Sequence, residues 1–152
     1  MEYGILTTRF TNETYEENRR WRETNNYVGC IYMSKKKISD SLPYDKPYFV
    51  IEMNNSINKI MGIGVINIKH CVNRENIYSN LYYNRYMYKG PKHIALHDGD
   101  KYVLDEELIE LFETPLFYGK GHMKRGQSMT HFPYKKMSED HVKCLKRILK
   151  LK

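Results

Sequence analysis

Two apolar segments joined by a short polar turn constrain the fold of this chain more than any other feature. Tyr48–Met53 is rich in aromatic and β-branched residues and predicts a buried strand. Residues 54–56 (Asn-Asn-Ser) have turn chemistry, and Lys59–Lys69 predicts the returning strand of a hairpin. Gly62 and Gly64 alternate in that strand and remove the side chains from one face. Another backbone or helix is therefore expected to pack closely there, with a ligand as the alternative.

The remaining sequence predicts further short strands and about three helices. Strands are expected at residues 3–8, 28–33, 82–88, 93–96, 116–118 and 127–132. Helices are expected at residues 12–23, after Asp105 and after Ser138, because a capping residue precedes each of these segments. A length of 152 residues suits one domain, residues 1–152, with a real hydrophobic core. The predicted class is α+β, with a small curved sheet or partial β-barrel and flanking helices.

Positive charge is concentrated at the C-terminal end. The formal net charge of the chain is +7. Residues 118–152 contain ten Lys and Arg but only two acidic residues, so this quarter carries +8 and the rest of the chain −1. A nearly neutral body with a basic end indicates a polyanionic partner, either nucleic acid or an anionic membrane surface.

The basic end begins with a glycine-rich stretch, residues 119–132, which we call the basic segment. Its glycines allow positive φ and a close approach of the backbone to a ligand. Lys120, Lys124 and Arg125 supply positive charge for phosphate groups. Gln127 and Ser128 follow, and their side chains can form hydrogen bonds with the edge of a base or sugar. A solvated hairpin loop without a ligand is the alternative interpretation.

Cysteine content and hydropathy indicate an intracellular protein. Cys30, Cys71 and Cys144 are far apart and lack paired spacing, which is typical of buried thiols rather than of disulfides or a zinc site. No apolar run approaches the roughly 18 residues of a membrane span. The N-terminus has no signal-peptide pattern. We therefore expect a cytoplasmic or nuclear protein that is not secreted and does not enter a membrane.

The sequence contains no recognisable catalytic or metal-binding constellation. His97, Asp98 and Asp100 belong to a turn, and nothing nearby completes a metal site. Gly119 and Gly121 precede a predicted strand rather than the helix that a dinucleotide site requires. No Ser–His–Asp order, nucleophile elbow or Walker-type loop is present. These observations predict a binding module without a cofactor or metal, rather than an enzyme.

Several short motifs follow one another in the C-terminal third. They are Leu116-Phe117, Lys-Arg-Gly-Gln-Ser at 124–128, Phe132-Pro133, and Met-Ser-Glu-Asp-His at 137–141 before a terminal helix. This order resembles the C-terminus of EVE domains. The strand at residues 48–53 and the Gly-Ile-Gly-Val stretch at 62–65 are similar to the arrangement in EVE and YTH domains of the PUA-like group. In this chain the Leu-Ser-Val strand of EVE domains is replaced by Gln127-Ser128-Met129.

The resemblance implies a PUA-like fold that binds nucleic acid. EVE and YTH domains are similar in holding a modified base in a pocket between the strands of the barrel and the C-terminal turn. The resemblance therefore implies that Trp21, Arg125 and Ser128 border such a pocket in this chain. It does not identify the base.

Physical reasoning about a bound base points to the same regions. A base needs an aromatic face for stacking, worth about 1–3 kcal/mol, and polar groups for its edge. Basic side chains contact the flanking phosphates. For the base pocket we predict Trp21, Asn25, Tyr32, Ser34, Gln127 and Ser128. For the phosphate contacts we predict Lys120, His122, Lys124, Arg125, Lys135 and Lys136. Packing inside the protein is the alternative role for Trp21 and Tyr32.

Three functions are therefore open at this point. The favoured prediction is a monomeric module that binds RNA or single-stranded DNA and recognises a modified base. A metal-independent nuclease or nucleotide-processing enzyme could instead use His122 or His131, with Lys124 or Arg125 stabilising the phosphate. A protein-binding adaptor could dock the basic helix at residues 138–150 on an acidic partner.

Overall fold

The computed structural model describes residues 3–39, 41–68, 75–98, 101–102, 106–125 and 129–150. The elements along these residues are β1 (Gly4–Phe10), α1 (Asn12–Thr24), β2 (Cys30–Ser34), β3 (Tyr48–Asn54), β4 (Lys59–Ile66), the 3₁₀-helix η1 (Leu81–Asn84), β5 (Tyr86–Gly90), β6 (Lys92–Ala95), β7 (His97–Asp98), β8 (Lys101–Tyr102), α2 (Glu106–Leu108), the π-helical stretch η2 (Ile109–Glu113), α3 (Thr114–Phe117), β9 (Thr130–His131), the 3₁₀-helix η3 (Tyr134–Lys136) and α4 (Glu139–Ile148). The predicted α+β class is confirmed.

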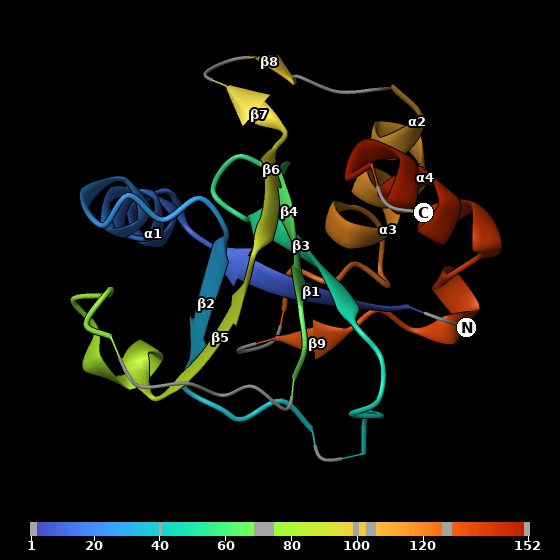
Figure 1. Ribbon diagram of the computed structural model, residues 1–152. Helices are drawn as coiled ribbons and strands as arrows, with labels where there is room; N and C mark the ends of the chain where they lie inside the picture. The colour runs from blue at the N-terminus through green and yellow to red at the C-terminus, as the bar shows by residue number, and fades with distance from the viewer. Residues whose placement is uncertain are drawn as a thin grey trace.

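A five-stranded mixed sheet in the order β6-β4-β3-β1-β9 forms the centre of the molecule (Figure 1). Strands β1 and β3 run parallel, and the other neighbouring pairs are antiparallel. Strands β2 and β5 form a separate two-stranded ribbon, as do β7 and β8. The strands of the described residues therefore form an open sheet with a ribbon beside it, and they do not close into a barrel.

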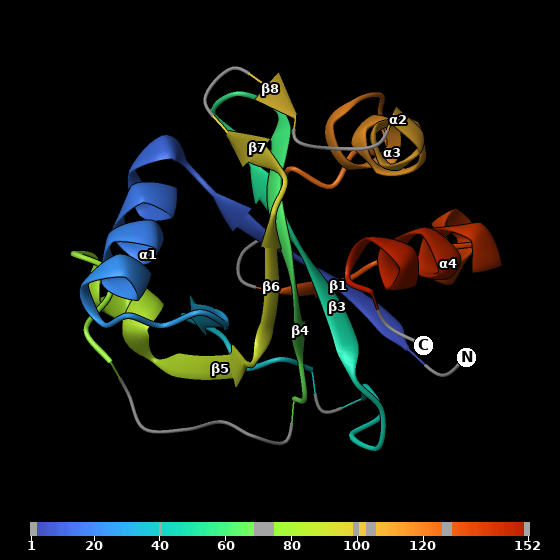
Figure 2. The same ribbon diagram turned by 45° about the horizontal axis from the view of Figure 1, so that its top comes forward.

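Both faces of the central sheet are covered. Figure 2 shows α1 and the β2–β5 ribbon on one side of the sheet, and α2, α3 and α4 on the other. Strand β3 contributes to both cores. Val50 packs into the core on the ribbon side, and Phe49 and Ile51 pack into the core beneath the helices. The apolar run of β3 is explained by this position, because a strand buried on both faces has no solvent side for polar residues.

Helix α1 begins at the predicted position and is anchored by a buried polar residue. Thr11 and Thr14 form a reciprocal capping box at its N-terminus. Asn18 is only 3% exposed and donates a hydrogen bond of 2.8 Å to the Ile31 carbonyl and one of 3.0 Å to the Tyr78 hydroxyl. These bonds fix α1 on strand β2, so that the start of the helix lies beside the ends of β1 and β2.

Two predicted strands are wrong in part or in whole. The predicted strand at residues 82–88 is the helix η1 followed by strand β5. The buried side chain of Asn84 turns the chain there by accepting bonds from the Ile77 and Tyr78 amides and donating to the Tyr78 carbonyl. The predicted strand at residues 116–118 continues the helical segment instead, because Leu116 and Phe117 pack into the core beneath α4.

The glycine face of β4 is filled by the protein itself. A Cβ on Gly64 would collide with the Tyr32 hydroxyl and with Cys30 of the ribbon. A Cβ on Gly62 would lie 2.9 Å from His93 Nε2 and 3.0 Å from Glu52 Oε1. The expectation that another element packs closely against these glycines is therefore confirmed.

The groups that pack there form a buried polar cluster. Glu52 accepts a bond of 2.6 Å from the Tyr32 hydroxyl and one of 2.8 Å from His93 Nε2. Burial alone would raise the pKa of the Glu52 carboxyl. Attraction to His93 and the hydrogen bonds from His93 and Tyr32 outweigh burial and hold this pKa below its ordinary value. Burial raises the pKa of the neighbouring Cys30 thiol to about 12, so this thiol stays protonated.

Candidate nucleic-acid interface

A pocket of about 230 Å³ opens where strands β1 and β2 end and helix α1 begins. We call it the Arg9 pocket. Arg9 and Phe10 line it from the end of β1, and Lys35 lines it from the residue after β2. Tyr78 and Tyr83 line it from the segment that leads into and through η1. The parallel pairing of β1 with β3 also brings the turn after β3 to this edge of the sheet.

The Arg9 pocket is tied directly to the basic segment. Arg9 donates a bond of 2.7 Å from Nε to the Met123 carbonyl and one of 2.5 Å from Nη1 to Thr130 Oγ1. Asn55, which also lines the pocket, donates a bond of 3.0 Å to the Lys124 carbonyl. Burial lowers the pKa of Arg9, but a guanidinium remains charged at any physiological pH. The pocket thus has a fixed cation in its wall and the basic segment beside it.

One wall of the pocket is a positioned aromatic face. Tyr83 packs edge-on against Tyr78, with ring centroids 6.1 Å apart, and remains 39% exposed. The hydrogen bond from Asn18 holds the Tyr78 hydroxyl in place behind it. The buried Oδ1 of Asn55 has no hydrogen-bond partner among the described residues. A buried acceptor without a partner is rare in folded proteins.

Among the described residues that we predicted for the base pocket, Ser34 lies at the Arg9 pocket. Ser34 lines the pocket wall, where its hydroxyl donates a bond of 2.7 Å to the Lys36 carbonyl. Tyr32 lies in the core with its hydroxyl on Glu52, because it faces the central sheet from the ribbon. Gln127 and Ser128 lie outside the described residues.

Trp21 and Asn25 lie near the other end of α1 from the pocket. Residues 11 and 21 of a helix are separated by about 15 Å along its axis. The ammonium of Lys89 lies 5.4 Å from the centroid of the Trp21 ring and 5.3 Å from that of Tyr27, a cation–π geometry. Asn25 donates a bond to the Trp21 carbonyl at the helix end. Both residues therefore have contacts within this end of the protein, away from the Arg9 pocket.

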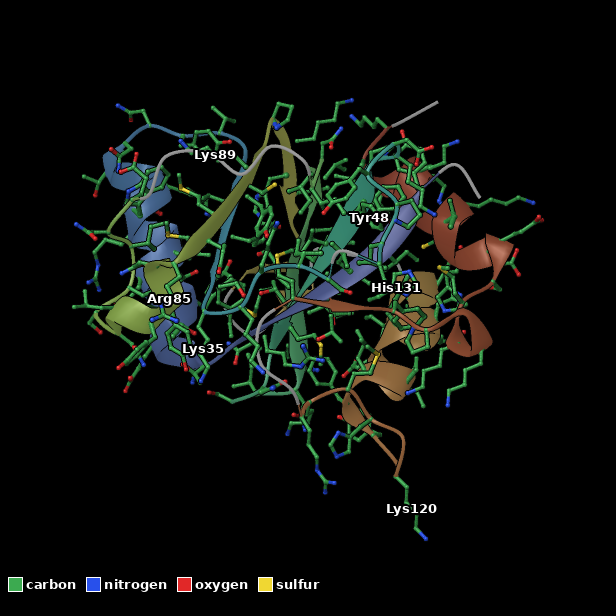
Figure 3. All side chains as sticks on the ribbon, turned by 90° about the horizontal axis from the view of Figure 1, so that it is seen from below. Lys35, Tyr48, Arg85, Lys89, Lys120 and His131 are labelled. Atoms are coloured by element: carbon green, nitrogen blue, oxygen red, sulfur yellow. The ribbon has the colours of Figure 1, made fainter. Side chains whose placement is uncertain are left out.

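The residues predicted for phosphate contacts gather around the basic segment. Lys120, Arg125 and Lys135 are exposed, and His122, Lys124 and Lys136 are half-buried. Lys136 Nζ donates to the Gly121 carbonyl, which brings η3 against the segment. The His122 ring accepts a bond of 3.2 Å at Nδ1 from the Lys124 amide. Figure 3 shows Lys120 projecting outward at the tip of the segment.

The two described glycines at this tip have different roles and give a test of the local geometry. Gly119 has a φ of +81°, whereas a Cβ on Gly121 would meet only Lys136 Nζ at 3.6 Å. We expect Gly119→Ala to lower the free energy of unfolding by about 1–2 kcal/mol, because the left-handed conformation is strained for a residue with a Cβ. Gly121→Ala is the matched control and should change it by less than about 0.5 kcal/mol. Urea unfolding measures both values, and equal effects would contradict the assigned conformation.

The histidines of the enzymatic alternative do not form a shared site in the described residues. His131 lies in β9 opposite Leu6, near Tyr48 in Figure 3 and apart from the tip at Lys120. Burial and the charge of Lys46 lower the pKa of His131. No described contact connects His131 with His122, which interacts with its own turn. Among the described residues, no three His, Cys, Asp or Glu side chains are placed to hold a metal ion.

Two basic side chains of α4, the helix of the adaptor alternative, make contacts within the molecule. Arg147 pairs with Glu107 at 2.6 Å, and Lys146 Nζ lies 5.4 Å from the centroid of the Tyr3 ring. Both contacts attach α4 to other parts of the chain. The ion pair with Glu107 offsets the charge of Arg147, whereas Lys146 keeps its positive charge.

Comparisons with protein-family models, with curated proteins and with solved structures find no match for this chain. Within the described part of the chain, no helix combines the length and apolar character that a membrane crossing requires. A function is therefore assigned from the site alone.

Proposed function

We propose that this protein is a PUA-like nucleic-acid-binding module that holds one base in the Arg9 pocket. The basic segment follows the phosphates on one side of that base. The observation that carries the proposal is the direct connection of the pocket wall to the basic segment through Arg9 and Asn55. A pocket and a basic surface that share their supporting residues provide a base site and a phosphate site at adjacent positions.

The chemistry of the pocket suits a single base. A volume of about 230 Å³ is smaller than the roughly 300–1,000 Å³ of sites for drug-sized ligands, and it favours one planar ring system over a whole nucleotide. Tyr83 offers its ring for stacking, and the lining residues Thr11 and Ser34 carry hydroxyl groups that can bond to the edge of a base. The first turn of α1 adds the positive end of a helix dipole, which favours the oxygen atoms of a base or phosphate.

A modified base is the favoured ligand within this proposal. Phe10 and Met33 line the pocket and provide apolar surface that a methyl group could contact. Burying one methyl group against such surface contributes on the order of 0.8 kcal/mol, which corresponds to about a fourfold preference.

Fluorescence anisotropy with short single-stranded oligonucleotides tests the proposal. The oligonucleotides should be unmodified or carry N6-methyladenine or 5-methylcytosine, and binding should be measured at two salt concentrations. We expect Tyr83→Ala to weaken binding by about 5- to 150-fold and to reduce the preference between bases, because stacking is lost. We expect Lys120→Ala to weaken binding to all sequences alike and to lower the salt slope by about one unit.

Trp21→Ala serves as the aromatic control, because Trp21 lies near the other end of α1 and contacts Lys89. This variant should keep the affinity and base preference of the unchanged protein. If Tyr83→Ala instead leaves the base preference intact while every lysine variant weakens binding, the protein has a basic surface without a base pocket. Absence of binding to any oligonucleotide would contradict the whole proposal.

A further inference from the structure

Helix η1 presents an aromatic side chain to solvent directly beside the Arg9 pocket. Tyr82 is 62% exposed, and the next residue, Tyr83, forms part of the pocket wall. The backbone that holds them is fixed at both ends of the helix. Asn80 accepts a bond of 3.1 Å from the Tyr82 amide, and the buried Asn84 bonds to the segment before η1. Tyr82 is therefore held outward by an ordered turn.

One cationic side chain lies at the Tyr82 ring and another lies at the neighbouring pocket. The guanidinium of Arg85 lies 5.3 Å from the ring centroid. Ser34 pairs with Tyr86 at the end of the β2–β5 ribbon, so Lys35 follows and Arg85 precedes the last pair of this ribbon. Figure 3 labels both side chains in the same part of the view, on the side of the molecule that carries α1 and η1. Lys35 lines the Arg9 pocket, whereas Arg85 lies at the exposed ring.

We propose that Tyr82, Arg85 and Lys35 form a second nucleotide site, a stacking platform next to the Arg9 pocket. The base adjacent to the pocketed base stacks on Tyr82, and the phosphate between the two nucleotides is held by Arg85 and Lys35. This inference rests on the proposed function, because the platform continues the strand whose first base occupies the pocket. It specifies a single-stranded polynucleotide, RNA or DNA, as the ligand.

The geometry of η1 requires the two bases to separate. A 3₁₀-helix has three residues per turn, so consecutive side chains point about 120° apart. Tyr82 and Tyr83 therefore offer their rings in different directions, and bases bound to them cannot stack on each other. A duplex cannot supply this arrangement without unpairing, because its base faces are covered by neighbouring pairs. The combination of aromatic rings and cations also favours a polynucleotide over an acidic protein surface, because every nucleotide supplies a planar ring beside a phosphate.

Fluorescence anisotropy with matched single-stranded and duplex oligonucleotides, in RNA and DNA forms, tests the platform. We expect Tyr82→Ala to weaken single-strand binding by about 5- to 150-fold while leaving the preference between bases unchanged. Tyr82→Phe keeps the ring and should bind like the unchanged protein. Leu81→Ala is the local control, because Leu81 is 74% exposed in the same helix but has no aromatic face.

The possible outcomes distinguish a failure of the platform proposal from a failure of the pocket proposal. Unchanged single-strand binding by Tyr82→Ala, with a loss of base preference in Tyr83→Ala, overturns the platform and leaves the pocket. Equal affinity for duplex and single strand also overturns the platform. If the unchanged protein binds no oligonucleotide, both proposals fail. The protein could also bind anionic vesicles or an acidic peptide but no single strand. If Tyr82→Ala abolished that binding, the surface would belong to another partner and the inference would be overturned.

Discussion

Replacing His93 with alanine is expected to lower the free energy of unfolding by about 3–5 kcal/mol at neutral pH. In a chain of 152 residues this corresponds to a fall of about 6–20 °C in melting temperature. The Glu52 side chain is only 3% exposed, and His93 Nε2 lies 2.8 Å from its carboxylate. Without His93 the carboxylate keeps the bond from Tyr32 but remains buried and uncompensated. Thermal and urea unfolding at neutral pH measure the change.

The pH dependence of this variant has a definite sign. In the unchanged protein the pKa of Glu52 is lowered in the folded state, so its contribution to stability is present above the ordinary pKa of a glutamate and is lost as pH falls through the lowered value. In His93→Ala the attraction and the hydrogen bond from His93 are lost, so burial raises the pKa of Glu52 in the folded state. Protonation of Glu52 in acid should then stabilise the folded variant. The stability difference between the two proteins should therefore shrink on acidification. A difference that grows in acid would contradict the assigned charge on Glu52.

Two further variants separate the charge of the pair from its packing. His93→Gln keeps a donor for Glu52 and should lose less stability than His93→Ala. The double variant Glu52→Gln/His93→Ala should lose less than the sum of its two single changes, because no buried charge is left without a partner. Strict additivity of the single effects would show that the cluster acts only by filling space.

The sequence carried enough information for most of the fold because many of its signals are local. The capping residues Thr11 and Ser138 mark the starts of α1 and α4, where the structure has capping boxes. The apolar run at Tyr48–Met53 marks a strand buried on both faces. The first part of the segment at residues 82–88 was predicted incorrectly, because its turn depends on hydrogen bonds between Asn84 and the backbone of Ile77 and Tyr78. The alternating tyrosines favour a strand when these hydrogen bonds are not known.

The candidate site was less accessible from the sequence because it depends on pairing between distant segments. Arg9 and Asn55 reach the same pocket because β1 runs parallel to β3, a relation that no local pattern specifies. A signal was nevertheless present in Tyr82 and Tyr83, which adjoin Arg85. Because the chain contains fourteen tyrosines, a single tyrosine says little about a binding site until its exposure to solvent is known. The basic segment, by contrast, was identified from charge and glycine content alone.

Gly90→Ala is expected to lower the free energy of unfolding by about 3 kcal/mol or more. Gly90 ends β5, where the ribbon presses against β4, and a Cβ there would fall on the carbonyl oxygen of Val65. Insertion of extra atoms into a packed site typically costs about 1–3 kcal/mol, and a backbone carbonyl within a sheet cannot rotate away as a side chain would. We therefore expect the upper end of this range or a larger loss. Urea unfolding followed by far-UV circular dichroism measures it.

Graded replacements of other glycines test whether this loss comes from the junction between ribbon and sheet. Gly62→Ala would place its Cβ 2.8 Å from the Ile94 carbonyl oxygen, a less severe contact, and should cost less than Gly90→Ala. Gly121→Ala should cost least, because this position is exposed and its Cβ would make only an ordinary contact with Lys136 Nζ. If Gly90→Ala does not accumulate as a folded protein, Gly62→Ala still tests the order. A Gly90→Ala protein as stable as Gly121→Ala would mean that the ribbon can move off β4. Strands β2 and β5 would then not hold the end of the ribbon, which Lys35 and Arg85 adjoin, in a fixed position.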